Sequence, residues 1–196
     1  MAVPQRQAAD ESLLRATADA IVKWGVTGVT LERIAAEAGM SRATIYRRGV
    51  SCEQLVDALV TRMRQGFRDA VWPALTAPGT AADRLRAALD GLWQLAEEYL
   101  ALMANMFTAD DEELHREAAD GLVVDVFAEP FERLLRDGAA DGTLRDLSPT
   151  VTATALLSTA GWGYIHLRAH HGWSPERTRA AVLDLLLRGV LAEPAG

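Results

Sequence analysis

The sequence predicts an all-α fold of about nine helices, with an N-terminal three-helix domain that contains a helix-turn-helix and a larger helical C-terminal domain. Apolar residues recur every three or four positions along most of the chain, and no stretch alternates as a half-buried strand would. Within residues 30–48, a glycine and a serine separate two short helical patterns. A chain of 196 residues can hold two domains, which we place at residues 1–50 and 51–196.

The first two helices are separated by a glycine-containing connector, residues 25–30. The first helix is expected to end before this connector, and the second to begin directly after it. Their buried faces follow from helical spacing: Leu13, Thr17, Ala20, Ile21 and Trp24 on the first, and Leu31, Ile34, Ala35 and Ala38 on the second. Gly39 then supplies the left-handed backbone that a tight turn between helices requires.

The third helix has the residue pattern of a DNA-recognition helix. Ser41 is placed to cap it, and Ile45 points inward. Together with Ser41, the side chains left for a DNA groove and its phosphates are Arg42, Ala43, Thr44, Tyr46, Arg47 and Arg48. We expect Arg42 and Thr44 at base edges, and Tyr46, Arg47 and Arg48 mainly at phosphates. Thr30, at the start of the second helix, is a further candidate phosphate contact.

Residues 8–60 resemble the DNA-binding region of the tetracycline-repressor (TetR) family of transcriptional regulators. The resemblance rests on Leu31-Glu-Arg-Ile-Ala35, Ala38-Gly-Met-Ser41, Thr44-Ile-Tyr-Arg47 and Ser51-Cys-Glu-Gln-Leu55. Two positions depart from the family pattern. Gly49 stands where a phenylalanine usually packs, and Cys52 stands where a lysine usually contacts a phosphate.

Charge is distributed unevenly along the chain. The net charge is −7, but residues 1–48 hold seven Lys and Arg against five Asp and Glu, which gives +2. The remaining residues hold thirteen Lys and Arg against twenty-two Asp and Glu, which gives a net charge of −9. This asymmetry suits a small DNA-binding head on an acidic body, and a chance fluctuation over a short segment is the alternative.

The single cysteine, Cys52, cannot form a disulfide within the chain. Because Cys52 lies near a helix start, its thiol pKa could be lowered, and the thiol could then sense oxidants. The simpler interpretation is a surface thiol without a role. No apolar run approaches the length of a membrane span, and the N-terminus lacks a signal-peptide core. We therefore expect a cytoplasmic protein.

Helices continue beyond residue 50. Leu55, Leu59, Met63 and Phe67 recur at four-residue spacing on a long fourth helix, which Pro73 is expected to end. Helical patterns follow over residues 85–100 and 102–107, either continuous or separate. Four acidic residues at 110–113 favour another helix start. Pro130 lies within the helical pattern that follows these residues and predicts a kink or a break at that point.

The last two helices begin at Ser148-Pro149 and Ser174-Pro175, where a capping serine precedes a proline at the first helical position. They are expected to end near residues 170 and 191. Resemblance to the TetR family implies that both helices pair with those of a second copy in a homodimer. Their apolar residues suit such an interface: Ala153, Leu156, Leu157, Ala160, Gly163, Tyr164 and Leu167 on one, and Val182, Leu185, Leu186, Gly189 and Val190 on the other. The alternative is that these stripes pack only within the monomer.

The resemblance further implies a pocket for a small molecule between the fifth and eighth helices. Candidate wall residues are Trp93, Met103, Met106, Phe107, Phe127 and Trp162. Aromatic and methionine side chains at helical spacing are also what an ordinary core contains, so core packing is the alternative for each of them. As a group they form an adaptable apolar lining.

A metal-dependent enzyme or metal sensor is a competing interpretation. His166 and His170 lie four residues apart on one expected helix, with His171 and His115 as further candidate ligands. No glutamate follows His166 in the pattern of a zinc hydrolase, and the sequence holds no nucleophile elbow, phosphate loop or dinucleotide fingerprint. A body that binds a protein partner in place of a ligand is a third interpretation.

The favoured interpretation is a ligand-responsive, DNA-binding transcriptional regulator and not an enzyme. We expect a repressor that binds a near-palindromic operator in duplex DNA as a homodimer. A small apolar effector is expected to release it, and neither a metal, a cofactor nor a membrane is expected to take part.

Overall fold

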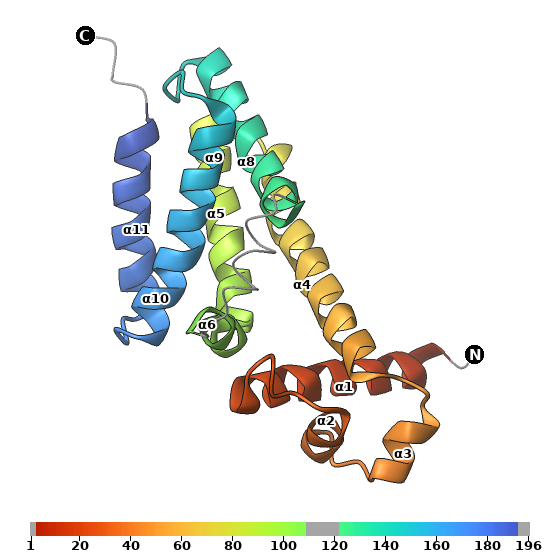
Figure 1. The fold of residues 1–196 in the computed structure, drawn as a ribbon. Coiled ribbons are helices and arrows are strands. Elements are labelled where there is room, and N and C mark those ends of the chain that lie inside the picture. The colour runs from red at the N-terminus through yellow and green to blue at the C-terminus, as the bar shows by residue number, and fades with distance from the viewer. Residues whose placement is uncertain (1–2, 109–121, 192–196) are drawn as a thin grey trace. The chain divides into compact units, whose positions relative to one another are not determined.

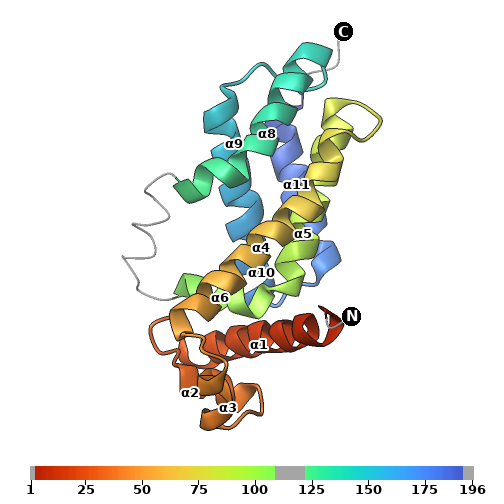
Figure 2. The ribbon, with the colours of Figure 1, turned by 90° about the vertical axis from the view of Figure 1, so that its right-hand side faces the viewer.

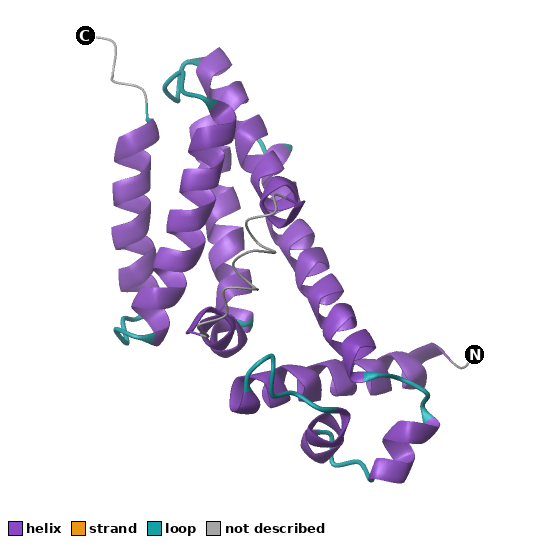
Figure 3. Ribbon diagram, in the orientation of Figure 1, coloured by secondary structure: helices purple, strands orange, loops and turns teal. Residues whose placement is uncertain are grey.

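The computed structural model describes residues 3–108 and 122–191, with side chains at all of these except 3–10, 106–108 and 122–126. Its elements are shown in Figures 1 and 3: α1 (Val3–Trp24), α2 (Leu31–Glu37), α3 (Arg42–Arg47), α4 (Cys52–Leu75), α5 (Ala81–Glu98), α6 (Leu100–Thr108), α8 (Leu122–Asp141), α9 (Pro149–Ser158), the π-helical turn η1 (Thr159–Gly163), α10 (Tyr164–Ala169) and α11 (Pro175–Val190). The described residues contain no β-strand, only one isolated bridge between Leu144 and Leu191. The predicted all-α fold is confirmed.

The chain divides into two compact units. The first consists of Met1–Gln65 and Ala101–Ala109, and the second of Gly66–Leu100 and Asp110–Gly196. The boundary between Gln65 and Gly66 falls inside α4, so this helix contributes to both units. None of the helices in the described ranges is both long and apolar enough to cross a lipid bilayer.

The core of the first unit forms where α1, α2 and α3 meet the beginning of α4. Its buried side chains are Leu13, Ala16, Ala20, Ile34, Ala35, Ile45 and Leu55. Gly39 has a φ of +64°, and its N–H and that of Met40 donate to carbonyls at the end of α2. This is the left-handed turn expected between the two helices of the helix-turn-helix.

The second unit packs α5 against α8 and against the α9-to-α11 segment (Figure 2). Trp93 and Tyr164 are both fully buried, and their rings stack with centroids 5.6 Å apart. Beside them, Arg168 Nε donates to Glu97 Oε1 at 2.6 Å and joins α10 to α5. This ion pair and the Tyr164 hydroxyl, which donates to the same carboxylate, hold the pKa of Glu97 below its usual value.

Two expectations about helix ends and faces are wrong, and a third is narrowed. Helix α4 continues through Pro73 to Leu75 and closes through i+3 bonds, in which the N–H groups of Thr76 and Ala77 donate to carbonyls of the last turn. Helix α8 continues past Pro130, so of the kink or break expected there the break does not occur, whereas the kink is not contradicted. Trp24 is 37% exposed and not buried. Its ring contacts the guanidinium of Arg33, with 5.2 Å between the ring centroid and Cζ.

The helix expected from Pro149 to about residue 170 contains a π-helical turn. Helix α9 passes into η1 and then into α10, with Gly161 and Gly163 inside the turn. The carbonyl of Ala160, also in η1, accepts the indole N–H of Trp93 at 3.0 Å. A π turn disturbs the ordinary helical ladder, and here one of its carbonyls bonds a side chain of α5.

Candidate nucleic-acid interface

Helix α3 is fixed to the first unit by one buried side chain and one serine cap. Ile45 is fully buried in the core. Ser41 Oγ accepts the backbone N–H of Thr44 at 3.2 Å, and the two hydroxyl oxygens lie 2.9 Å apart. The cap therefore orients the side chain of Thr44 as well as the start of the helix.

The other faces of α3 carry the residues expected to meet DNA. Arg42, Ala43, Tyr46, Arg47 and Arg48 are exposed, as is the cap Ser41, whereas Thr44 is half-buried. Arg47 reaches back over one turn, and its Nη2 donates to Thr44 Oγ1 at 3.5 Å. Three guanidinium groups within seven residues are suited to phosphates and to the acceptor edges of guanine.

Tyr46 forms a hydrogen bond that the sequence did not predict. Although the Tyr46 side chain is 57% exposed, its hydroxyl donates to Glu32 Oε1 at 2.7 Å. This bond lowers the pKa of Glu32 and raises the pKa of Tyr46, so at neutral pH the carboxylate stays charged and the phenol protonated. A negative charge therefore lies beside a candidate phosphate contact.

Replacing Glu32 with glutamine is expected to tighten binding to any duplex several-fold at low salt. Glutamine keeps an acceptor oxygen for Tyr46 but removes the negative charge that repels phosphates. Fluorescence anisotropy over a range of salt concentrations measures the effect, which should shrink as salt rises. Glu98→Gln, at an exposed position of α5, is the matched control. Weaker binding by Glu32→Gln would mean that the carboxylate itself assists DNA contact.

Thr30 lies at the start of α2 and is exposed. Its Oγ1 accepts the backbone N–H of Arg33 at 3.3 Å, so the residue is the N-cap of this helix. Ser41 has the same role on α3, which means that two of the candidate DNA-binding residues also define helix starts.

The two departures from the family pattern lie between α3 and α4. Gly49 has a φ of +65°, a conformation that a phenylalanine at this position would adopt only with strain. Cys52 is half-buried against the core of the first unit, and its thiol lies 3.7 Å from the Val29 carbonyl. Burial raises the pKa of the Cys52 thiol, so the alternative of a lowered pKa and a reactive thiolate is wrong.

The candidate ligand-wall residues occupy different surroundings. Trp93 is fully buried beside Tyr164, and Phe127 packs edge-on against Phe67 with centroids 4.6 Å apart. Trp162 is 41% exposed on η1. Met103 is half-buried on the part of α6 that belongs to the first unit. The side chains of Met106 and Phe107 lie outside the described residues.

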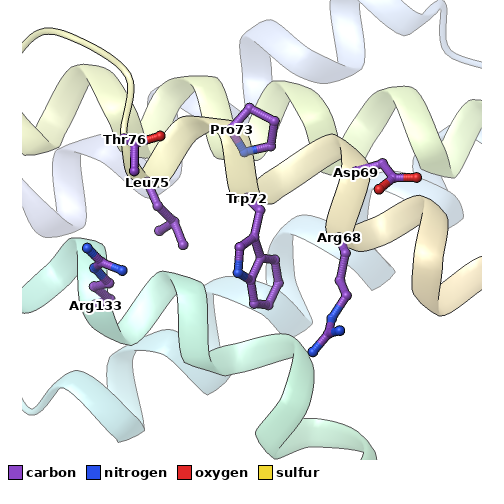
Figure 4. Close-up of a pocket in the computed structure, with 7 residues that line it drawn as sticks. All are labelled: Arg68, Asp69, Trp72, Pro73, Leu75, Thr76 and Arg133. Atoms are coloured by element: carbon purple, nitrogen blue, oxygen red, sulfur yellow. The ribbon is translucent and has the colours of Figure 1, made fainter.

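A cleft of about 630 Å³ lies in the second unit, between α4 and α8 (Figure 4). It is lined by Arg68, Asp69, Trp72, Pro73, Leu75, Thr76 and Arg133. None of the candidate ligand-wall residues whose side chains the structure describes lines it. Sequence periodicity gave no signal for it, because residues from two helices distant in the chain form it together.

Three histidines gather at the end of α10. The Nε2 atoms of His166 and His171 lie 3.2 Å apart, and the rings of His166 and His170 have centroids 5.1 Å apart. Within the described part of the chain, no three His, Cys, Asp or Glu side chains are placed to hold one metal ion. His115 lies outside the described residues.

Family models match most of the chain. Residues 13–59 match the model described as bacterial regulatory proteins of the tetR family, and residues 78–190 match a tetracyclin repressor-like C-terminal domain. No curated protein matches the chain.

Solved structures of the same fold cover nearly the whole chain. A TetR/AcrR-family transcriptional regulator from Thermobifida fusca is 23% identical, with 92% of this chain and 97% of that chain covered and a TM-score of 0.66. The ketosteroid transcriptional regulator KstR2 of Mycobacterium tuberculosis is 18% identical, with 94% and 95% covered and a TM-score of 0.74. The fatty acid degradation regulator FadR from Bacillus halodurans is 16% identical, with 92% and 95% covered and a TM-score of 0.76.

These comparisons confirm the resemblance seen in the sequence. The matched N-terminal region contains the helix-turn-helix with its exposed α3, and the matched C-terminal region contains most of the second unit. Members of the family are DNA-binding regulators, generally ligand-responsive repressors, and not enzymes. The chain belongs to the TetR family and is a transcriptional regulator with a helix-turn-helix DNA-binding domain and a ligand-binding C-terminal domain.

Proposed function

We propose that this regulator is a homodimeric repressor that binds a near-palindromic operator through α3 and releases it when a small lipophilic effector binds. The exposed, guanidinium-rich face of α3 is the observation that carries the proposal. We assign DNA binding to residues 1–50, and effector binding and dimerisation to residues 51–196. The protein acts on DNA in the cytoplasm.

Anisotropy titrations with duplexes from the region around its own gene test this function. We expect salt-sensitive binding to a near-palindrome whose half-sites lie about one helical turn, roughly 34 to 36 Å, apart. The absence of salt-sensitive binding to every duplex of this region would refute the proposal.

Exposed apolar side chains on the last helices support the homodimer. Much of the apolar stripe on these helices is buried within the monomer, including Tyr164 and Val182. Val151, Trp162 and Leu185 remain 69%, 41% and 67% exposed on α9, η1 and α11. Large apolar side chains that remain exposed on neighbouring helices favour a surface that a second copy covers.

Replacing Leu185 with aspartate is expected to break the dimer and to weaken operator binding. In a two-fold interface each copy contributes its own carboxylate, so two buried charges lack a partner. Sedimentation velocity measures the dimer, and anisotropy measures the operator. Ala87→Asp, at an exposed position of α5, adds the same charge elsewhere. A Leu185→Asp protein that remains a dimer at micromolar concentration would exclude this face.

Two of the similar structures support a lipophilic effector. By name they are a ketosteroid transcriptional regulator and a fatty acid degradation regulator. An effector that prefers the conformation unable to bind DNA would weaken operator affinity by about 5- to 150-fold for a coupling of 1 to 3 kcal/mol. Linkage requires that operator DNA weakens effector binding by the same factor.

A further inference from the structure

The cleft between α4 and α8 combines two cationic groups with an apolar floor. Its cationic residues, Arg68 on α4 and Arg133 on α8, are both exposed. Figure 4 shows their side chains toward opposite ends of the cleft, with the indole of Trp72 and the side chain of Leu75 between them. Among the described lining residues Asp69 is the one carboxylate, so these residues carry a net charge of +1.

Arg133 differs from the charged residues that follow it on α8, because those residues form ion pairs. Arg136 pairs with Glu132 on the same helix, and Asp137 pairs with Arg84 of α5 at 2.9 Å. Within the described ranges, Arg133 has no ion-pair partner. The chain after residue 48 carries a net charge of −9, so a positively charged cleft in this region is contrary to its average charge.

The aromatic floor is held by packing inside the second unit. The Trp72 ring meets Phe67 edge-on with centroids 6.2 Å apart, and Phe67 packs against Phe127 in turn. The guanidinium carbon of Arg68 lies 5.4 Å from the Trp72 ring centroid, which restrains this side chain over the indole face. A ligand therefore meets a positioned cation beside a half-buried apolar surface.

We propose that this cleft binds an anionic amphiphile, a molecule with a carboxylate or phosphate group on an apolar body. The anionic group pairs with the guanidinium of Arg133 or Arg68, and the body lies mainly on the half-buried indole of Trp72, because the neighbouring Leu75 is only 4% exposed. Guanidinium groups suit carboxylate and phosphate equally, because both present the oxygen geometry of a bidentate contact. This inference deepens the proposed effector response. Ligand binding in the cleft does not depend on the proposed function, and only the expected loss of operator affinity rests on it.

Titration calorimetry with three twelve-carbon probes tests the cleft directly. Dodecanoate and dodecyl phosphate, used below their micelle concentrations, are expected to bind at least about tenfold more tightly than dodecanol, because only the anions form charge-assisted hydrogen bonds. The carboxylate and phosphate arms together show which headgroup the cleft prefers. Equal affinity for dodecanol and both anions would overturn the proposal.

Variants locate the site within the chain. The double variant Arg133→Gln, Arg68→Gln is expected to weaken anion binding about tenfold and to leave dodecanol binding unchanged, and the two single variants show which guanidinium pairs with the anion. Arg136→Gln, one turn along α8 and paired with Glu132, is the matched control and should bind as the unmodified protein does. Thermal unfolding of each variant shows that the fold is kept. Anion binding that survives Arg133→Gln and Arg68→Gln together would place the site elsewhere.

Calorimetry needs no DNA, so the two proposals fail separately. If the anions bind in the cleft but operator affinity stays constant in anisotropy, the cleft is a ligand site and its role as the effector site is refuted. If operator binding is found but no anion binds in the cleft, the anionic-amphiphile proposal fails and the repressor function stands.

Discussion

Replacing Arg42 with alanine is expected to weaken operator binding by about 2 to 6 kcal/mol, which is at least about 30-fold. Arg42 is the first residue of α3 and is exposed, and the N-terminal residues of a recognition helix are those that contact base edges. One bidentate arginine–guanine contact is worth about 1 to 3 kcal/mol, and a dimer loses two.

The measurement compares Arg42→Ala on the operator and on a scrambled duplex of equal length. Binding to the operator should fall far more than binding to the scrambled duplex, because a base contact carries sequence information. Arg86→Ala removes the same charge from α5, where Arg86 pairs with Asp83, and is the control. Equal losses on both duplexes would identify Arg42 as a phosphate contact.

Arg47→Ala is the complementary variant on α3. Because Arg47 is expected at a phosphate, its loss should weaken binding to all sequences alike. The dependence of log K on log salt should become shallower by about one unit for each head. Since Arg47 also donates to Thr44 Oγ1, Thr44→Ala should be measured beside it, with a changed sequence preference expected.

Replacing Trp93 with alanine is expected to destabilise the protein by about 3 to 5 kcal/mol. Trp93 is fully buried, stacks on Tyr164, and donates its indole N–H to the Ala160 carbonyl of the π turn at 3.0 Å. Alanine leaves a large cavity and removes the hydrogen bond between α5 and η1. Urea unfolding followed by circular dichroism measures the free energy of unfolding.

Two further tryptophan variants separate packing from hydrogen bonding. Trp93→Phe keeps most of the ring but loses the N–H donor, so a smaller loss of about 1 to 2 kcal/mol is expected. Trp162→Ala, at a side chain that is 41% exposed, should change unfolding little under conditions where the protein is monomeric. A Trp93→Ala protein as stable as the original would mean that the surrounding helices close the cavity.

Much of the first unit could be predicted from local sequence. The turn at Gly39, the cap at Ser41 and the buried face of Ile45 follow from residues within one or two helical turns of each other. The exposed arginines of α3 follow from the same spacing. Helix ends were less certain, since Pro73 lies inside α4 and η1 interrupts the helix between α9 and α10.

The contacts between distant residues could not be predicted in this way. Tyr46 and Glu32 are 14 residues apart, and Trp93 and Ala160 are 67 apart. Helical periodicity states which face of a helix is apolar, but it does not state which other helix covers that face. For this reason Trp93 and Trp162 were equivalent candidates in the sequence, although one is buried in the core and the other exposed.

The sequence by itself therefore determined the all-α class, the helix-turn-helix and the family, because these depend on short-range spacing and on the backbone chemistry of glycine, serine and proline. Only the tertiary structure brought Arg68 and Arg133, which are 65 residues apart in the chain, to one cleft. It also placed Glu32 against Tyr46. Such pairs arise from the packing of whole helices, in which each side chain's surroundings depend on every other helix of its unit.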